Sequence, residues 1–164
     1  MPIAFISMPT DQARAFQAGA PDANGQPPER HISDGDGLPC RHCQQDIGPG
    51  EPYLILALRP FPAPQPYAEI GPIFLHAQAC RRYPETGEVP PMFLKRERYL
   101  LKGYNALDRI IYGTGQIVTP TEIPAAAEHI FERPEAAYVH VRSGFNNCFQ
   151  CRIERGLPAG RRWP

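Results

Sequence analysis

The chain has 164 residues, enough for one domain with a hydrophobic core of its own. Its 17 lysines and arginines balance 17 aspartates and glutamates, so its net charge does not attract it to nucleic acid or to an anionic membrane. No apolar run approaches the ~20 residues of a membrane span, and the first residues lack the basic start of a signal peptide. We therefore expect a cytoplasmic protein with no membrane partner.

The N-terminal part of the chain predicts a strand, a short helix and a long loop. Residues 2–7 are apolar and strand-like. Residues 10–19 predict a helix, with Thr10 as its N-cap and Gly19 as its stop. Residues 20–39 hold many turn formers and no periodic pattern, so they predict a loop. Proline is frequent, at 21 residues in the chain, which favours long ordered loops.

The middle of the chain predicts two strands and a short helix. Residues 52–61 form an apolar run, and residues 71–76 form a second one. Residues 77–83, which follow directly, predict one or two turns of helix. Residues 98–104 and 109–118 lie on either side of a short turn sequence, and we expect them to form a β-hairpin.

The last third of the chain predicts a helix and then a strand. Residues 119–134 have the clearest helical pattern, with Thr121 as the predicted cap and with Ile123, Ala126, Ala127 and Ile130 on one face. Residues 136–143 predict a strand.

The mixed order of strands and helices, with hairpin-length links, predicts the α+β class. We expect a small single domain over residues 1–155, built on a largely antiparallel sheet with two or three short helices and long loops rich in proline and glycine. Residues 156–164 are expected to form a flexible tail.

Two pairs of potential metal ligands occur in the first half of the chain. Five cysteines in a reducing compartment favour metal binding or catalysis over disulfides. Cys40 and Cys43 form a Cys-x-x-Cys pair on a tight turn, and His76 and Cys80 would lie one helical turn apart. Two such pairs make the four ligands of a tetrahedral structural zinc site. The order of turn, hairpin and helix start over residues 39–83 resembles a treble-clef zinc finger.

Other assignments of the cysteines stay open. Cys148 and Cys151 form a second Cys-x-x-Cys pair, which could complete an all-cysteine zinc site with Cys40 and Cys43. The same pair could instead be a redox-active dithiol, in which Cys148 and Cys151 are the catalytic residues, or two buried core thiols. His42 lies between the first two cysteines and is a competing ligand, although such a position usually points outwards.

Three segments of the chain resemble a bacterial family known as domain of unknown function 1203. They are "SDGDGLPCRHC" (33–43), "GPIFLHAQAC" (71–80) and "YVHVRSGFNNCFQCRIER" (138–155). The resemblance implies a small, bacterial, cytoplasmic, single-domain protein, and it implies no activity, cofactor or partner.

The residues favour a zinc-binding protein whose metal is structural and whose role is to bind a protein or a small molecule. Four protein ligands leave no open coordination position, which argues against metal-assisted hydrolysis. A thiol redox protein or sensor using Cys148 and Cys151 is the alternative. A nucleic-acid-binding zinc module is weaker still, because it would depend on two local basic runs, namely Lys95, Arg96 and Arg98, and Arg152, Arg155, Arg161 and Arg162.

Overall fold

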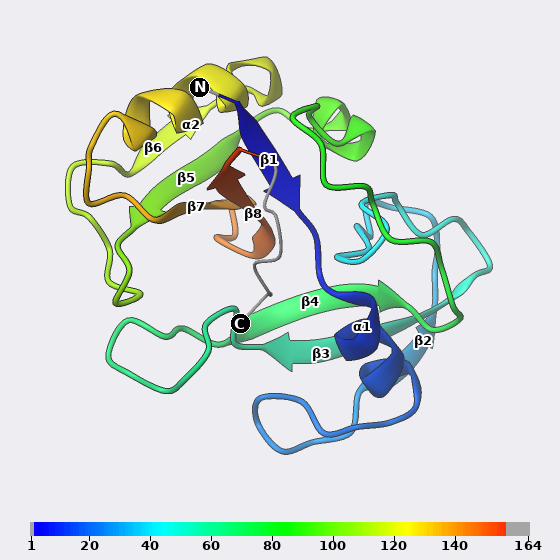
Figure 1. The fold of residues 1–164 in the computed structure, drawn as a ribbon. Helices are drawn as coiled ribbons and strands as arrows, with labels where there is room; N and C mark the ends of the chain where they lie inside the picture. Colours follow the sequence, from blue (N-terminus) through cyan, green and yellow to red (C-terminus); the bar gives the residue numbers. More distant parts are fainter. Residues whose placement is uncertain (1, 157–164) are drawn as a thin grey trace.

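The computed structural model describes residues 2–156. In this part of the chain, two antiparallel sheets form separate layers (Figure 1). The larger sheet has five strands, in the spatial order β1 (Ile3–Ile6), β8 (Phe149–Arg155), β7 (Tyr138–Ser143), β5 (Tyr99–Tyr104) and β6 (Gln116–Val118). The smaller sheet has the order β2 (Glu29–Ile32), β3 (Pro52–Leu58) and β4 (Gly71–His76).

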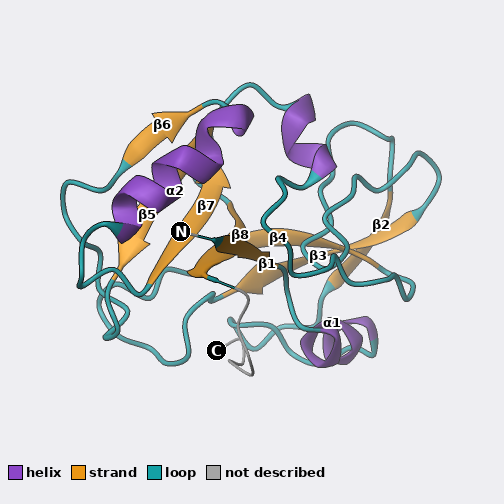
Figure 2. Cartoon of the chain, turned by 45° about the horizontal axis from the view of Figure 1, so that its top comes forward, coloured by secondary structure: helices purple, strands orange, loops and turns teal. Residues whose placement is uncertain are grey.

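Two α-helices cover the sheets on different sides of the molecule (Figure 2). They are α1 (Thr10–Gln17) and α2 (Ile123–Phe131), and two 3₁₀ helices, η1 (Pro91–Lys95) and η2 (Pro120–Glu122), lie before β5 and α2. The predicted α+β class is therefore confirmed. Residues 157–164 of the predicted tail lie outside the described part of the chain.

The main core lies between α2 and the five-stranded sheet. Ile123, Ala127 and Ile130 of the predicted apolar helix face are buried there, and Ala126 packs against the same cluster. They meet alternate residues of the strands, such as Val141 of β7. Full burial of one such isoleucine stabilises the fold by about 1.5–3 kcal/mol.

A second core lies on the three-stranded sheet. Leu54, Leu56 and Leu75 are buried in it, together with Ala13 of α1 and Phe149 of β8. Because Phe149 belongs to the larger sheet, its side chain joins the two layers at the edge where β8 begins. The candidate site lies beside this junction.

Several predicted details are wrong. Residues 77–83 form bends and irregular chain instead of helix, and β2 lies inside the predicted loop over 20–39. Pro9, not Thr10, is the N-cap residue of α1. Thr119 and Glu122 form the capping box before α2, in place of a cap at Thr121.

The predicted hairpin is only partly regular. β5 pairs with β6 in antiparallel register, with Tyr99 opposite Val118. Residues 109–115 make one isolated bridge, between Ile110 and Tyr104, and otherwise leave the ladder. Thr114 attaches this segment to β5, because its hydroxyl accepts a hydrogen bond from the Gly103 backbone N–H at 2.9 Å.

Candidate metal centre

The first cysteine pair lies on a tight backbone turn before β3. The N–H of Cys40 donates to the carbonyl of Gln45 at 2.9 Å, and the N–H of Gln44 donates back to the carbonyl of Cys40 at 3.0 Å. Gln44 has a φ of 56°, in the left-handed region that reverses the chain sharply. This turn aims the side chains of Cys40 and Cys43 in the same direction.

Buried polar side chains fix this turn against β8. Arg41 is 2% exposed, and its guanidinium donates to the carbonyl oxygens of Phe149, at 2.5 Å, and Pro39, at 2.6 Å. The amide of Gln44 donates to the carbonyl of Gln150 at 3.2 Å. The turn is therefore bonded to the five-stranded sheet at the edge where the two layers meet.

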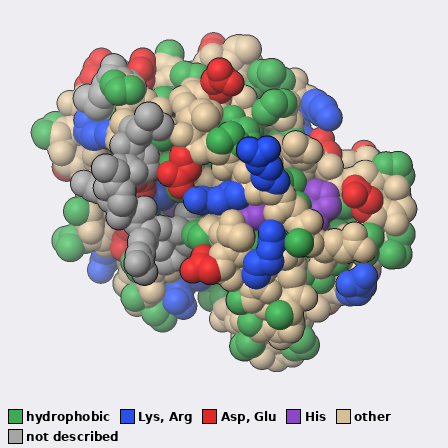
Figure 3. All heavy atoms as spheres, turned by 45° about the vertical axis from the view of Figure 1, so that its right-hand side comes forward, with side chains coloured by type: hydrophobic (Ala, Val, Ile, Leu, Met, Phe, Trp, Pro, Cys, Tyr) green, Lys and Arg blue, Asp and Glu red, His purple; other side chains and the backbone are tan. Residues whose placement is uncertain are grey.

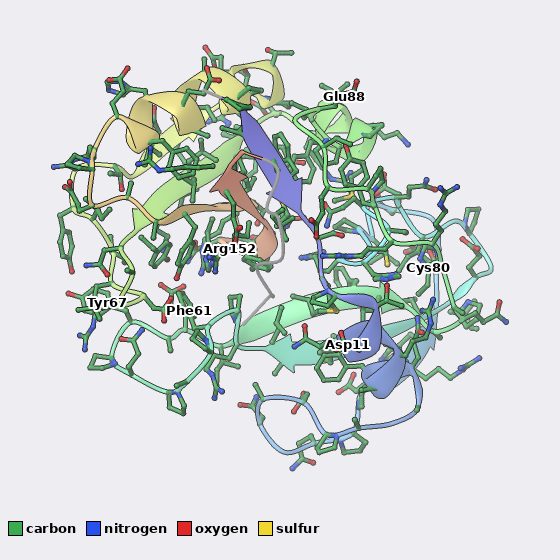
Figure 4. All side chains as sticks on the ribbon, in the orientation of Figure 1. Asp11, Phe61, Tyr67, Cys80, Glu88 and Arg152 are labelled. Carbon is green, nitrogen blue, oxygen red and sulfur yellow. The ribbon has the colours of Figure 1, made fainter. Side chains whose placement is uncertain are left out.

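The second pair of ligands comes from β4 and from the loop that follows it. His76 is the last residue of β4, and Cys80 lies in the irregular segment after it. Arg14 of α1 donates to the backbone carbonyl of Cys80 at 2.8 Å, and Gln17 donates to the carbonyl of His76 at 2.9 Å. Figure 4 shows Cys80 close to α1. Hydrogen bonds from α1 thus hold His76 and Cys80 in place, whereas the sequence predicted that a helical turn over residues 77–83 would do so.

The four predicted ligands form one cluster. The Sγ atoms of Cys40, Cys43 and Cys80 and a ring nitrogen of His76 all lie within 4.8 Å of one another. Cys40 Sγ lies 3.9 Å from Cys80 Sγ, and Cys43 Sγ lies 3.5 Å from Nδ1 of His76. All five cysteines are free thiols.

These distances fit a tetrahedral metal ion. Zinc bonds of ~2.3 Å to sulfur and ~2.0 Å to nitrogen would place two sulfur ligands ~3.8 Å apart, and a sulfur and a nitrogen ~3.5 Å apart. The cluster has both spacings, at 3.9 and 3.5 Å. Three cysteines and one histidine that can hold a metal ion are thus brought together by the fold.

The cluster favours negative charge on the sulfur of Cys40. Hydrogen bonds from Cys43 and Cys80 hold the pKa of the Cys40 thiol far below its usual range, whereas hydrogen bonds with Cys40 and Cys80 raise the pKa of Cys43. Hydrogen bonds to Cys40 and Cys80 raise the pKa of His76 to about 10. Several ionisable ligands at this spacing therefore compete for protons, and a bound cation would relieve that competition.

His42 has a role that the sequence interpretation missed. We expected it to point outwards, but it is 0% exposed. Its Nδ1 lies 3.0 Å from Sγ of Cys80, and its Nε2 lies 2.9 Å from the hydroxyl of Thr10. Burial lowers the pKa of His42, which favours the neutral ring. A neutral ring can accept from Thr10 and donate its one N–H to the sulfur, as groups next to metal ligands commonly do.

A carboxylate lies on the other side of the cluster. Oε2 of Glu51 is 3.8 Å from Nε2 of His76, the ring nitrogen that does not face Cys43. The same carboxylate oxygen accepts the N–H of Gly48 at 2.6 Å. At 3.8 Å the contact is an ion-pair distance and longer than a hydrogen bond, so Glu51 lies where a carboxylate behind a metal-binding histidine would lie. The sequence alone gave no signal for it, because Glu51 is ordinary among exposed turn residues.

Cys148 and Cys151 do not join this cluster. Cys151 is 1% exposed and lies in the core beneath α2, where burial raises the pKa of its thiol. Cys148 is half-buried in the loop before β8, and its thiol faces the carbonyl of Asn146 at 3.7 Å. A register shift places Val141 opposite Cys151 but Arg142 opposite Phe149, so Gln150 is an extra residue in the strand. The structure thus places the two thiols in different surroundings.

The predicted basic runs are largely neutralised within the described residues. Arg96 and Lys95 pair with Asp46 at 2.5 and 3.7 Å, and Arg98 pairs with Glu97. Arg161 and Arg162 lie outside the described part of the chain. In Figure 3, lysine and arginine side chains are scattered over the visible face with acidic side chains among them. Each helix in residues 2–156 also falls short of the length and apolar character that crossing a membrane requires.

The fold and the cluster together define an α+β domain with a Cys₃His group that can hold a metal ion. Residues 37–155 match the family model described as "Protein of unknown function (DUF1203)". The chain belongs to this family, as the three sequence segments predicted. The matched span includes all four residues of the cluster and both remaining cysteines. Neither a curated protein nor a solved structure gives a significant match.

Proposed function

We propose that this protein binds one zinc ion through Cys40, Cys43, His76 and Cys80, and that the zinc is structural. The observation that carries the proposal is the approach of four soft or borderline ligand atoms to within 4.8 Å of one another. Sulfur-rich sets of four select zinc over magnesium or calcium, which prefer oxygen ligands.

The structural role follows from the number and position of the ligands. Four protein ligands would fill a tetrahedral shell and leave no position for a substrate or a reactive water. The ligands join the turn at residues 40–43, the end of β4 and the loop at Cys80, which are far apart in the chain. The same turn is bonded to β8. A metal ion there would hold the two sheets at their shared edge.

Only part of the predicted treble-clef arrangement supports this proposal. The cysteine turn and the β3–β4 hairpin have the expected order, and β3 pairs with β4 from Tyr53 opposite His76 onwards. The helix that would carry the last ligand is replaced by irregular chain at residues 77–83. The centre would therefore use the first two elements of a treble clef, and α1 would support the third ligand segment from outside.

The biological role that we assign to this domain is binding of a protein or a small molecule. A closed metal centre gives no catalytic group, and the buried position of Cys151 weakens the redox alternative. Balanced charge along the chain weakens the nucleic-acid alternative. A reducing cytoplasm, the compartment that we propose, would keep the cysteines available as ligands.

The test is metal content and free-thiol count on freshly reduced protein, for the wild type and for two matched variants. We expect about one zinc per chain in the wild type and in Cys148→Ser, and none in Cys80→Ser. Zinc lost in Cys148→Ser and kept in Cys80→Ser would move the site to the two Cys-x-x-Cys pairs. Protein free of metal in every sample, with reversible disulfides, would contradict the zinc proposal and favour the thiol redox function.

A further inference from the structure

A cavity of about 320 Å³ lies at the end of β4 away from the metal-ligand cluster. Gly71 and Pro72, which begin β4, line the cavity, whereas His76 at the other end of the strand belongs to the cluster. Five residues of strand span roughly 16 Å. The cavity therefore belongs to a part of the molecule that the metal centre does not use. Its volume is at the lower end of the range for small-molecule sites.

The walls of this cavity are of two kinds. One wall is apolar and includes Leu58, Ile70 and Phe149. The other is polar and includes Arg142 and Glu69. An apolar lining combined with a few polar groups is the usual composition of a site for a small organic ligand.

Arg142 is buried and held in place before any ligand arrives. Its side chain is 4% exposed, which is unusual for an arginine. Its Nη2 lies 3.3 Å from Nδ1 of His140, and its Nη1 donates to the carbonyl of Asn147 at 3.2 Å. His140 is fully buried, and its burial lowers its pKa well below the usual value, so the neutral ring can accept from Arg142. The Nε of Arg142 is buried and has no hydrogen-bond partner among the described residues.

Arg142, Glu69 and Lys102, which lies behind Glu69 and outside the cavity lining, together carry one excess positive charge. Here two cations share the carboxylate of Glu69, whose oxygens lie 2.9 Å from Arg142 Nη1 and 3.3 Å from Lys102 Nζ. The neighbouring acid Glu154 pairs with Arg152 at 2.8 Å. Figure 4 shows Arg152 on β8, beside the region between the sheets where Phe61 also lies. Glu69 is more exposed than the arginine, at 39% of its side chain, so it is the partner that a ligand can displace.

We infer that this cavity binds a small organic monocarboxylate, whose carboxylate pairs with Arg142 and whose apolar part lies against Leu58, Ile70 and Phe149. The single excess positive charge matches one negative charge on the ligand. The planar guanidinium, with Nε still unpaired, suits a carboxylate that accepts two hydrogen bonds. In the ligand-free protein, Glu69 takes the place of that carboxylate as an internal counterion.

The test is calorimetric titration of the metal-loaded full chain with hexanoate, with the neutral isostere hexanamide and with inorganic phosphate. We expect saturable binding of one hexanoate per chain, and hexanamide at least tenfold weaker. Arg142→Met should weaken hexanoate binding about 10- to 100-fold, the loss expected for one charged hydrogen-bonded pair. Glu69→Gln should strengthen it severalfold, because the competing negative charge is removed.

Three results would overturn this assignment. Equal binding of hexanamide would show that charge is not recognised, and tighter binding of phosphate would show that the apolar wall is not used. Unchanged or weaker hexanoate binding in Glu69→Gln would show that Glu69 does not compete with the ligand carboxylate for Arg142. This variant tests the proposal even if Arg142→Met does not fold. Metal content measured on the same samples separates a failure here from a failure of the zinc proposal.

Discussion

The two Cys-x-x-Cys pairs have the same spacing and opposite surroundings. Cys40 and Cys43 lie on a turn closed by Gln44 in the left-handed region, which directs both sulfurs to one point. Cys148 precedes β8, and Cys151 lies within it beyond an extra residue, so one thiol is near the surface and the other is in the core. Spacing alone therefore does not make a ligand pair. The backbone must also turn, and a second pair must approach from elsewhere in the chain.

The two regions also differ in how their polar groups are used. Around the first pair, buried side chains such as Arg41 and His42 bond to the turn and to the cluster itself. Around Cys151, the neighbours are apolar residues beneath α2, such as Ile153 and Val141. We expect the first pair to be sensitive to loss of a ligand and the second to be sensitive only to packing.

The largest effect should follow loss of one ligand from the first pair. Cys40→Ser should release the metal and lower the free energy of unfolding by about 3–5 kcal/mol, because the junction of the two sheets loses its cross-link. For a chain of this size, that corresponds to a fall in Tm of about 6–20 °C. Metal content and thermal unfolding by circular dichroism measure both effects. If Cys40→Ser kept its metal and its Tm, the first pair would not be a ligand pair and would not differ from the second in this respect.

A smaller effect is expected from Cys151→Ser in the second pair. A serine hydroxyl in this apolar core should cost about 1–3 kcal/mol in the free energy of unfolding, with no loss of metal. Cys151→Val is the matched control, because it keeps the site apolar, and it should cost less than about 1.5 kcal/mol. Urea unfolding of both variants gives the comparison. Loss of zinc in either one would place Cys151 among the ligands.

The sequence predicted the members of the cluster better than the structure around it. The residue types and the two close pairs were enough to group Cys40, Cys43, His76 and Cys80 as candidate ligands, and the fold brings these four side chains together. The predicted reason for the second pair was wrong, because residues 77–83 are not helical. His76 and Cys80 converge through bonds from α1 to their backbone carbonyls, and such long-range contacts have no signature in local sequence.

The elements of the fold show the same limit. Strands with strong apolar patterns, such as β4, were predicted with correct bounds, and the buried face of α2 was predicted from its periodicity. β2 was missed, since its residues are all exposed and it joins the sheet by pairing with β3. Neither Glu51 nor the buried Arg142 could be predicted, because their partners lie far away in the sequence or depend on a turn.

His42 offers a sharper test of the first region without removing a ligand. His42→Phe keeps an aromatic ring but removes the N–H beside Cys80, so metal affinity should fall about tenfold, at the low end for groups next to a ligand. Thr10→Val is the milder companion, since it removes only the hydroxyl partner of the ring. Competition with a coloured zinc chelator measures the affinity. An unchanged affinity in His42→Phe would mean that the contact with Cys80 does not support the metal.

The smallest effect on stability is expected from Cys148→Ser, within about 0.5 kcal/mol, because this half-buried residue lines the cavity and its thiol contacts the carbonyl oxygen of Asn146. The same residue should nevertheless be the most reactive of the five cysteines towards iodoacetamide. Metal would protect the three clustered cysteines, and the core would protect Cys151. Mass spectrometry after brief labelling at neutral pH should find one fast site, absent in Cys148→Ser. Mild oxidation that instead joined Cys148 to Cys151 in a disulfide would require β8 to rearrange, and it would restore the redox interpretation of the second pair.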